Sequence, residues 1–177
     1  RYYHANAGIM ITASHTPAKY NGYKAYGPDG CPVTDHAAGV IYDEIQKTDI
    51  LEGAKHIPFA DGLASGMIAY VGDDCKEALY SAIEACAVRP GLCKTAGLKL
   101  VYSPLNGSGL VPVTRVLHDI GIDDITIVPE QQYPDGHFPT CPYPNPEIFE
   151  ALRLGLALAE KTGADLMLAP DPDADRV

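Results

Sequence analysis

The chain alternates between amphipathic segments and short apolar runs. Apolar residues at helical spacing predict helices over 34–47, 75–88, 111–120 and 145–162. Thr34 or Asp35 can cap the first helix, while Asn145 suits the start of the last helix and Gly163 its end. Apolar runs predict strands over 7–14, 23–27, 67–71, 98–102, 125–128 and 166–169. Loops are expected over 51–66 and 131–143.

The second half of the chain has the predicted order strand, helix, strand, helix, strand. This order favours right-handed crossovers and a parallel sheet with helices on both faces. Because Arg89-Pro90-Gly91 interrupts the pattern, we predict a first domain over 1–93 and a second over 94–177. We expect an α/β protein with three-layer α/β/α domains and a largely parallel mixed sheet. Ligands of such sheets bind beyond the carboxyl ends of the strands, where the loops 104–109 and 171–176 begin.

Composition restricts the class of protein. The 177 residues are 46% hydrophobic and 20% charged, which is typical of a globular protein. Thirteen basic residues against 23 acidic ones give a net charge of −10, so we expect neither a nucleic-acid nor an anionic-membrane partner. No apolar run approaches the roughly 20 residues that span a bilayer.

The cysteines and the two ends suggest a cellular location and a fragment. The five cysteines contain no CxxC pair, so we expect free thiols in the reducing cytoplasm, with a metal or redox role as the alternative. The chain begins at Arg1 without a methionine or signal peptide and ends at Val177 directly after an acidic cluster. We therefore expect a fragment of a longer cytoplasmic protein.

Alternating carboxylates form the sharpest chemical pattern. Asp171, Asp173 and Asp175 follow a predicted strand, and in an extended chain such residues point the same way. Pro172 favours the extended form. Oxygen-only donors select Mg²⁺ or Ca²⁺, and Arg176 offers a fork for a phosphate or a carboxylate. The alternatives are a solvated acidic loop or an EF-hand type calcium loop, although that loop would have glycine in place of Arg176.

A second pattern is the stretch TASHTP, where Ser14 ends a predicted strand. His15 is poorly suited as a base for Ser14, because adjacent residues of an extended chain point to opposite sides. The stretch also lacks the GxSxG pattern of hydrolase nucleophiles. Lys24 follows the turn at Asn21-Gly22 and, from the residues alone, is an ordinary solvated lysine.

These stretches together resemble one family. TASHTP, then NGYK, and much later DPDADR occur in the order found in the α-D-phosphohexomutases, the phosphoglucomutase and phosphomannomutase family, whose serine loop usually reads TASHNP and whose metal loop reads DxDxDR. SPLNGSG and VPEQQYPDGHFPTCPYPNPE look like further family segments. The YGPD stretch and the helix after it are more similar to the bacterial phosphoglucomutase branch. The resemblance covers essentially the whole chain and implies the rear of the first domain and the second domain of a four-domain enzyme.

The resemblance implies a role for each motif residue. Ser14 would carry the phosphoryl group, His15 would belong to the same loop, and Lys24 would be an acid/base or charge partner. Arg176 would lie near the phosphate. Mg²⁺ would be held by the phosphoserine oxygen and the three aspartates, namely Ser14, Asp171, Asp173 and Asp175. The implied activity interconverts glucose 1-phosphate and glucose 6-phosphate, with glucose 1,6-bisphosphate as intermediate and activator.

Two positions depart from the family pattern, and several alternatives stay open. Thr16 stands where the family usually has asparagine, and Asn106 stands where histidine is common. The alternatives are a phosphomannomutase, a phosphopentomutase, or a silent paralogue that binds a metal or a sugar phosphate. A phosphatase with an aspartyl nucleophile is a weaker candidate. Such enzymes typically carry the nucleophile in a DxDx[TV] motif after the first strand of their domain, whereas the acidic loop here follows the third predicted strand of the second domain. Without the other domains of the same polypeptide, the chain alone is expected to have little or no mutase activity.

Overall fold

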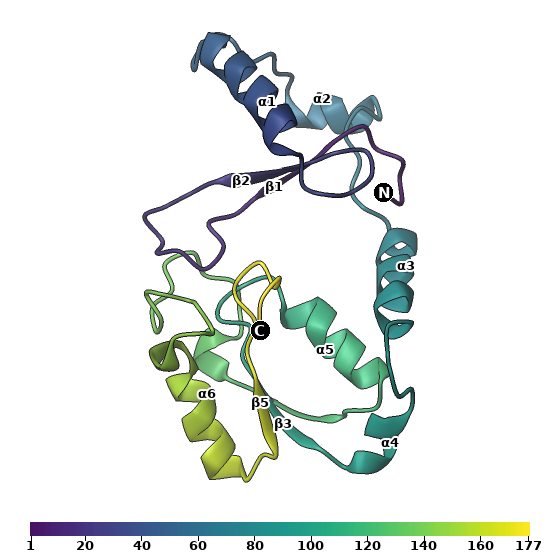
Figure 1. The fold of residues 1–177 in the computed structure, drawn as a ribbon, viewed down its shortest axis with the longest axis vertical. Helices are drawn as coiled ribbons and strands as arrows, with labels where there is room; N and C mark the ends of the chain where they lie inside the picture. Colours follow the sequence, from purple (N-terminus) through teal and green to yellow (C-terminus); the bar gives the residue numbers. More distant parts are fainter. The chain divides into compact units, whose positions relative to one another are not determined.

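The computed structural model describes all 177 residues (Figure 1). Its strands are β1 (Gly8–Ile11), β2 (Tyr23–Tyr26), β3 (Lys99–Tyr102), β4 (Asp124–Ile127) and β5 (Leu166–Leu168). Its α-helices are α1 (Asp35–Lys47), α2 (Phe59–Ala64), α3 (Asp73–Glu84), α4 (Leu92–Ala96), α5 (Leu110–Asp119) and α6 (Phe149–Thr162). The chain divides into two compact units, one of residues 1–10 and 23–78 and one of residues 11–22 and 79–177. The predicted domain boundary between residues 93 and 94 stays a prediction.

The unit of residues 11–22 and 79–177 is built on the predicted parallel sheet. The strand order is β4-β3-β5, and β3 pairs in parallel with both neighbours. Leu100 stands opposite Ile125 on one side and Leu166 on the other. Each crossover from strand to parallel strand passes through a helix, as the alternation in the sequence predicts. The expected α/β class and parallel sheet are confirmed.

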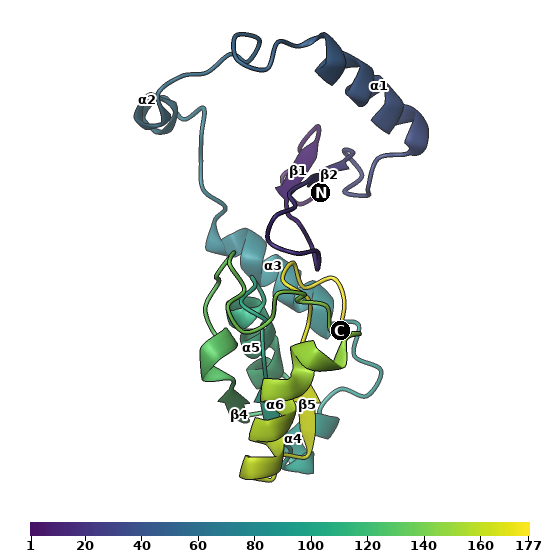
Figure 2. The same ribbon diagram turned by 90° about the vertical axis from the view of Figure 1, so that its left-hand side faces the viewer.

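Helices cover both faces of this sheet. Leu100 and Tyr102 pack on one face with Leu117 of α5, while Ala151 of α6 joins the buried cluster on the other face. Because side chains alternate along a strand, Val101, between Leu100 and Tyr102 in β3, faces α6. Figures 1 and 2 show the sheet between α5 and α6 within this unit, and α6 lies along β5 in both views. The three-layer arrangement is therefore present here.

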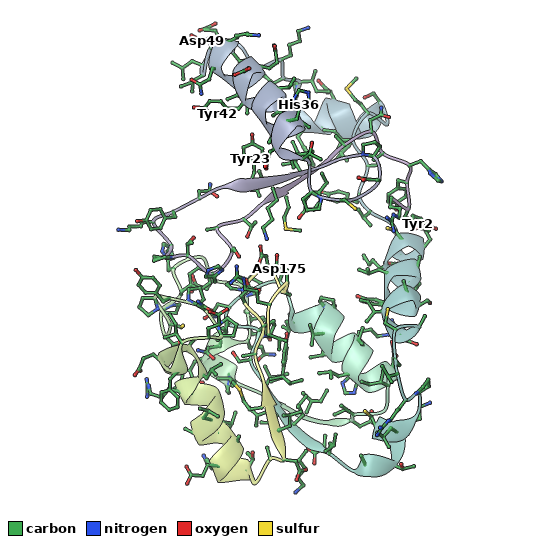
Figure 3. All side chains as sticks on the ribbon, viewed as in Figure 1. Tyr2, Tyr23, His36, Tyr42, Asp49 and Asp175 are labelled. Carbon is green, nitrogen blue, oxygen red and sulfur yellow. The ribbon has the colours of Figure 1, made fainter.

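The unit of residues 1–10 and 23–78 has little buried surface. β1 and β2 pair into a two-stranded sheet. The predicted cap of α1 is confirmed, because Thr34 Oγ1 accepts a hydrogen bond from the Ala37 N–H at 3.4 Å. No side chain of α1 is buried, and Tyr42 stands out from the helix (Figure 3).

Some predicted elements differ from the structure. Short helices α2 and α4 occupy a predicted loop and the break after Arg89, and no strand forms over 67–71. The helix predicted over 75–88 corresponds to α3, which begins earlier, at Asp73, and also ends earlier, at Glu84. α6 begins four residues later than predicted, because Asn145 closes a turn by accepting the Glu147 N–H instead of capping the helix. None of the helices combines the length and apolar character that crossing a membrane requires.

Candidate active site

The acidic loop after β5 is a turn. The Ala174 N–H donates to the Asp171 carbonyl at 2.9 Å, and Ala174 has a left-handed φ of 59°. The expected extended conformation is therefore wrong, because these local hydrogen bonds fold the loop back on itself. The three carboxylates still gather, since oxygens of Asp171, Asp173 and Asp175 lie within 4.8 Å of one another. The turn achieves the clustering that alternation in an extended strand was predicted to give.

Asp171 is the buried member of this cluster. It is 0% exposed, and its Oδ1 accepts the backbone N–H groups of Asp175 and Arg176, each at 3.1 Å. Burial raises the pKa of Asp171 above its ordinary value, and the neighbouring Asp173 carboxyl raises it further. Taking a carboxylate out of water disfavours its charged form unless a positive charge lies close by. The cluster thus has the electrostatic character of a cation site.

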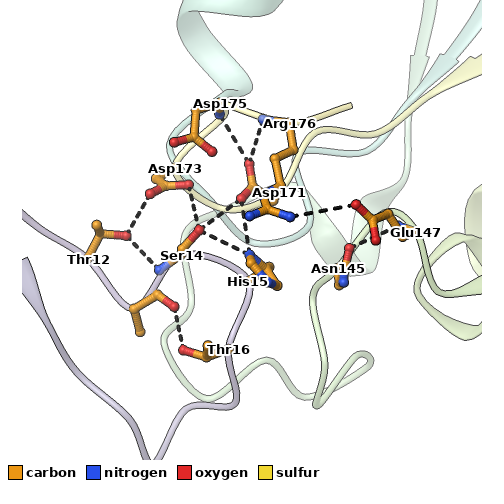
Figure 4. Close-up of polar contacts among 11 residues, drawn as sticks. Thr12, Ser14, His15, Thr16, Asn145, Glu147, Asp171, Asp173, Asp175 and Arg176 are labelled. Atoms are coloured by element: carbon orange, nitrogen blue, oxygen red, sulfur yellow. Dashed lines mark hydrogen bonds and ion pairs between the residues drawn. The ribbon is translucent and has the colours of Figure 1, made fainter. Parts of the chain in front are cut away.

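Ser14 lies against these carboxylates (Figure 4). Its Oγ is 3.1 Å from Asp171 Oδ2 and 3.3 Å from Asp173 Oδ1. Residues 11–22 belong to the same compact unit as the acidic loop, although more than 140 positions separate them in sequence. A hydroxyl has one hydrogen, so Ser14 can donate to only one of these oxygens at a time. The hydroxyl is therefore held where a group attached to it would adjoin the carboxylates.

His15 also faces the serine hydroxyl. Its Nδ1 lies 3.2 Å from Ser14 Oγ and 3.9 Å from Asp171 Oδ2. The expectation that adjacent side chains point apart is wrong here, because Ser14 has a left-handed φ of 51° instead of an extended conformation. Which ring nitrogen carries the proton decides whether His15 donates to the hydroxyl or accepts from it.

Thr12 lies within the TASHTP stretch, but the sequence predicted no role for it. Its Oγ1 accepts the Ser14 N–H at 2.8 Å and donates to Asp173 Oδ2 at 3.1 Å. A threonine hydroxyl can bond the backbone N–H two residues further on, so the spacing of Thr12 and Ser14 was a weak signal in the sequence. The contact with Asp173 left no trace in the sequence.

The loop after β3 holds the acidic loop in place. The Ser108 N–H and Oγ both donate to the Pro172 carbonyl, at 2.8 and 3.0 Å. Gly107 packs so closely on Pro172 that a Cβ at position 107 would lie 2.3 Å from the Pro172 Cα. The sequence predicted both loops at one edge of the sheet, but it did not predict that the loop after β3 supports the acidic loop.

Arg176 and Lys24 complete the set of predicted residues. Arg176 Nη1 lies 3.6 Å from Glu147 Oε1, and both side chains are substantially exposed. Its backbone N–H bonds to Asp171, so its position follows from the turn. Lys24 lies in β2, in the unit of residues 1–10 and 23–78, and its role toward Ser14 stays a prediction.

Two family models match most of the chain. The family described as "Phosphoglucomutase/phosphomannomutase, alpha/beta/alpha domain II" matches residues 79–177, and the corresponding domain I matches residues 1–52. The chain belongs to the phosphoglucomutase/phosphomannomutase family. The relatives reported below carry the names of mutases.

The relatives cover the chain from end to end. A phosphoglucomutase of Staphylococcus saprophyticus is 33% identical over 177 residues, which are 100% of this chain and 32% of that protein. A phosphoribomutase of Saccharomyces cerevisiae is 38% identical over 97% of this chain and 29% of its own length. A solved structure described as a phosphomannomutase, from Thermus thermophilus, has a TM-score of 0.75 at 26% identity and covers 99% of this chain and 36% of its own. The chain thus spans about a third of the length of the curated relatives it matches.

The two departures from the family pattern have structural roles in this chain. Asn106 has a left-handed φ of 54° and is 7% exposed, and its Nδ2 donates to the Tyr133 carbonyl at 2.8 Å. Asparagine tolerates this conformation better than most residues. Thr16 donates its hydroxyl hydrogen to the Ala13 carbonyl and so closes the turn that contains Ser14.

Proposed function

We propose that the complete polypeptide interconverts glucose 1-phosphate and glucose 6-phosphate, with Ser14 as the carrier of the phosphoryl group. The observation that supports this most is the placement of Ser14 Oγ 3.1 and 3.3 Å from two carboxylates at the carboxyl edge of a parallel sheet. Phosphorylated Ser14 gives its phosphoryl group to the free hydroxyl of the sugar phosphate. The bisphosphate then returns its other phosphoryl group to the Ser14 oxygen, which regenerates the phosphoserine. Added glucose 1,6-bisphosphate acts as activator because it phosphorylates a bare Ser14.

The charge balance of the site favours a divalent cation. A phosphoserine adds about −1.5 to −2 charges beside three carboxylates. The donors are all oxygens, they lie within 4.8 Å of one another and one aspartate is fully buried, so the residues fit Mg²⁺. Asp171, Asp173, Asp175 and the Ser14 oxygen would hold it. When bound, Mg²⁺ neutralises negative charge on the phosphoryl group and lowers the barrier to its transfer.

The remaining residues act on charge and protons. His15 Nδ1 hydrogen-bonds to the Ser14 oxygen and can give or take a proton there when the phosphoryl group leaves or arrives. Arg176 supplies positive charge near the phosphate and Lys24 acts as an acid/base or charge partner. The chain of residues 1–177 without the rest of the polypeptide has little mutase activity, because sugar recognition depends on segments outside it.

A ribose phosphate is the second candidate substrate. Relatives named phosphoribomutase, or probable phosphoribomutase, are 38% and 37% identical to this chain, against 33% for a phosphoglucomutase. The phosphoserine chemistry is the same for both sugars. Assays of the complete polypeptide with glucose 1-phosphate, mannose 1-phosphate and ribose 1-phosphate decide which sugar is turned over fastest.

The decisive experiment is peptide mapping of the complete polypeptide before and after exposure to glucose 1,6-bisphosphate and Mg²⁺. We expect a phosphoryl group on Ser14, and we expect Ser14→Ala to abolish both the label and the mutase activity. Ser81→Ala, on the exposed surface of α3, is the matched control and should keep both. Activity retained by Ser14→Ala would mean that another residue receives the phosphoryl group. A Ser14 that stays bare in an inactive protein would favour a silent binding paralogue.

The metal is tested separately by calorimetric titration with Mg²⁺. Asp173→Asn removes one charge from the cluster and should weaken Mg²⁺ binding. The loss of affinity should exceed the roughly 10–100-fold that is typical when a residue hydrogen-bonded to a metal ligand is changed. Asp43→Asn on exposed α1 changes the net charge equally and should leave the titration unaltered. An unchanged titration for Asp173→Asn would remove the acidic loop from the metal site.

A further inference from the structure

Thr12 links the two halves of the site through one hydroxyl group. We propose that Thr12 is a positioning residue that fixes the rotamer of Asp173 and the strained backbone of Ser14, a proposal that rests on the function proposed above. Its Oγ1 accepts the Ser14 N–H at 2.8 Å and lies 3.1 Å from Asp173 Oδ2 (Figure 4). Since the oxygen accepts from the backbone, its single hydrogen is free to point at the carboxylate.

The first bond stabilises a conformation that serine does not favour. Ser14 has a φ of 51°, and a non-glycine residue stays in this left-handed region only when its surroundings hold it there. The hydrogen bond from the Ser14 N–H to Thr12 spans this turn. Thr12 is itself anchored, because its own N–H donates to the Gly22 carbonyl at 3.0 Å. A β-branched side chain also has few χ1 alternatives, so its hydroxyl is well oriented.

The second bond gives Asp173 two contacts with the same short segment. Asp173 Oδ2 accepts from Thr12, while Oδ1 lies 3.3 Å from Ser14 Oγ. Both carboxylate oxygens of Asp173 are therefore aligned by residues 12–14. This alignment sets the direction in which the carboxylate faces the other two aspartates.

The two contacts of Asp173 respond differently to phosphorylation. Esterification of Ser14 removes its hydroxyl hydrogen, so the ester oxygen can no longer donate to Asp173. The hydrogen bond from Thr12 does not depend on the state of Ser14. Thr12 therefore keeps Asp173 oriented whether Ser14 is bare or phosphorylated. A constant orientation of Asp173 is needed because Ser14 alternates between these two states during turnover.

The test compares Thr12→Val with Thr12→Ser in the complete polypeptide. Valine keeps the shape but removes the hydroxyl, and serine keeps the hydroxyl. Calorimetric titration with Mg²⁺ alone should show about a tenfold loss of affinity in Thr12→Val, as is typical of residues that orient metal ligands, and recovery in Thr12→Ser. In kinetics, kcat should fall in Thr12→Val while KM for the sugar phosphate stays unchanged. Thr126→Val, a half-buried position in β4, is the matched control and should alter neither quantity.

Each outcome bears on one proposal at a time. Wild-type Mg²⁺ affinity and kcat in Thr12→Val would overturn the positioning role, and so would a serine variant as impaired as the valine variant. The Mg²⁺ titration needs no turnover, so it tests Thr12 even if Ser14 proves not to carry phosphate. If Thr12→Val fails to fold by circular dichroism, the titration is repeated with Thr12→Ala. Combining the foldable variant with Asp173→Asn should then give less than the sum of the two losses, while additive losses would contradict the proposal.

Discussion

The two compact units differ sharply in how much apolar surface they bury. In the unit of residues 11–22 and 79–177, Leu100 and Tyr102 of β3 are 1% and 0% exposed. In the unit of residues 1–10 and 23–78, Val40 and Ile45 of α1 are 53% and 44% exposed, and α1 buries no side chain. Helices gain most of their stability from packing an amphipathic face, so α1 rests on its cap and local hydrogen bonds.

The candidate site lies in the unit of residues 11–22 and 79–177, called the well-packed unit below. Ser14 and the acidic loop both belong to it, although Ser14 comes from the first part of the sequence. A site needs side chains that are held in place by a rigid surrounding, and the parallel sheet provides that under the acidic loop. Lys24 is the one predicted site residue that belongs to the other unit. The comparison therefore predicts that damage to the sheet affects the site and that damage to α1 does not.

The largest expected effect is that of Leu100→Ala at the centre of the sheet. Leu100 is 1% exposed and packs in the cluster with Leu117, so the truncation leaves a cavity and should cost about 3 kcal/mol of the free energy of unfolding. Hydrogen exchange of the 177-residue chain measures the amides of β3 and of α1 separately. We expect faster exchange throughout β3, β4 and β5.

Ile45→Ala is the matched truncation in α1. Because Ile45 is 44% exposed, we expect a cost below about 1 kcal/mol and unchanged exchange in β3. If Ile45→Ala proved as costly as Leu100→Ala, α1 would have packing that its exposure does not indicate, and the contrast between the units would fail.

A smaller effect is expected from Gly107→Ala, which acts on the contact between the loops of the well-packed unit. The added Cβ would lie 2.3 Å from Pro172 Cα and 2.4 Å from Pro172 O, and both are backbone atoms that cannot turn aside. We expect a loss of about 1–3 kcal/mol together with weaker Mg²⁺ binding, because the acidic loop must shift. Thermal unfolding and calorimetric titration check the two effects.

Gly136→Ala is the control for that substitution. A Cβ at position 136 meets no atom within 4 Å, so stability should change by less than about 0.5 kcal/mol and Mg²⁺ binding should not change. Equal behaviour of the two variants would show that the contact between the loops does not support the acidic cluster.

The sequence predicted the sheet of the well-packed unit better than it predicted the loops. Strands 98–102, 125–128 and 166–169 agree with β3, β4 and β5 to within one residue at each end, because continuous apolar runs between turn signals are distinctive. The strand predicted over 67–71 found no partner strand, and hydrophobic pattern alone does not reveal pairing. The short helices α2 and α4 have six and five residues, too few for a periodicity to be visible.

The candidate site was predicted by residue type but not by conformation. Ser14 and Ala174 both have a left-handed φ, which no local pattern indicated because neither is glycine, asparagine or aspartate. These conformations are held by the hydrogen bond that the Ser14 N–H donates to Thr12 Oγ1 and by hydrogen bonds within the acidic loop. The clustering of the three aspartates was therefore predicted from an incorrect backbone conformation. The role of Thr12 was not predicted, because its contact with Asp173 spans 161 positions.

The smallest effect we predict compares one thiol from each unit. Cys141 is 4% exposed in the unit of residues 11–22 and 79–177, and Cys31 is exposed in the other unit. Burial raises the pKa of the Cys141 thiol, and its Sγ donates to the Tyr143 carbonyl at 2.9 Å. Alkylating reagents attack the thiolate, so Cys141 should react with iodoacetamide at least about tenfold more slowly than Cys31, which corresponds to roughly 1.4 kcal/mol of protection.

The pH dependence of stability tests the same thiol by a second route. With a raised pKa, native Cys141 holds its proton more tightly than the unfolded chain does. Its contribution to stability is therefore complete below the ordinary thiol pKa of about 8.5 and is lost as pH rises through the raised value. Unfolding midpoints of the natural chain and of Cys141→Ala should converge between neutral and alkaline pH. Parallel curves for Cys141→Ala, or equal labelling of the two thiols, would mean that the region around Cys141 opens as readily as the poorly packed unit.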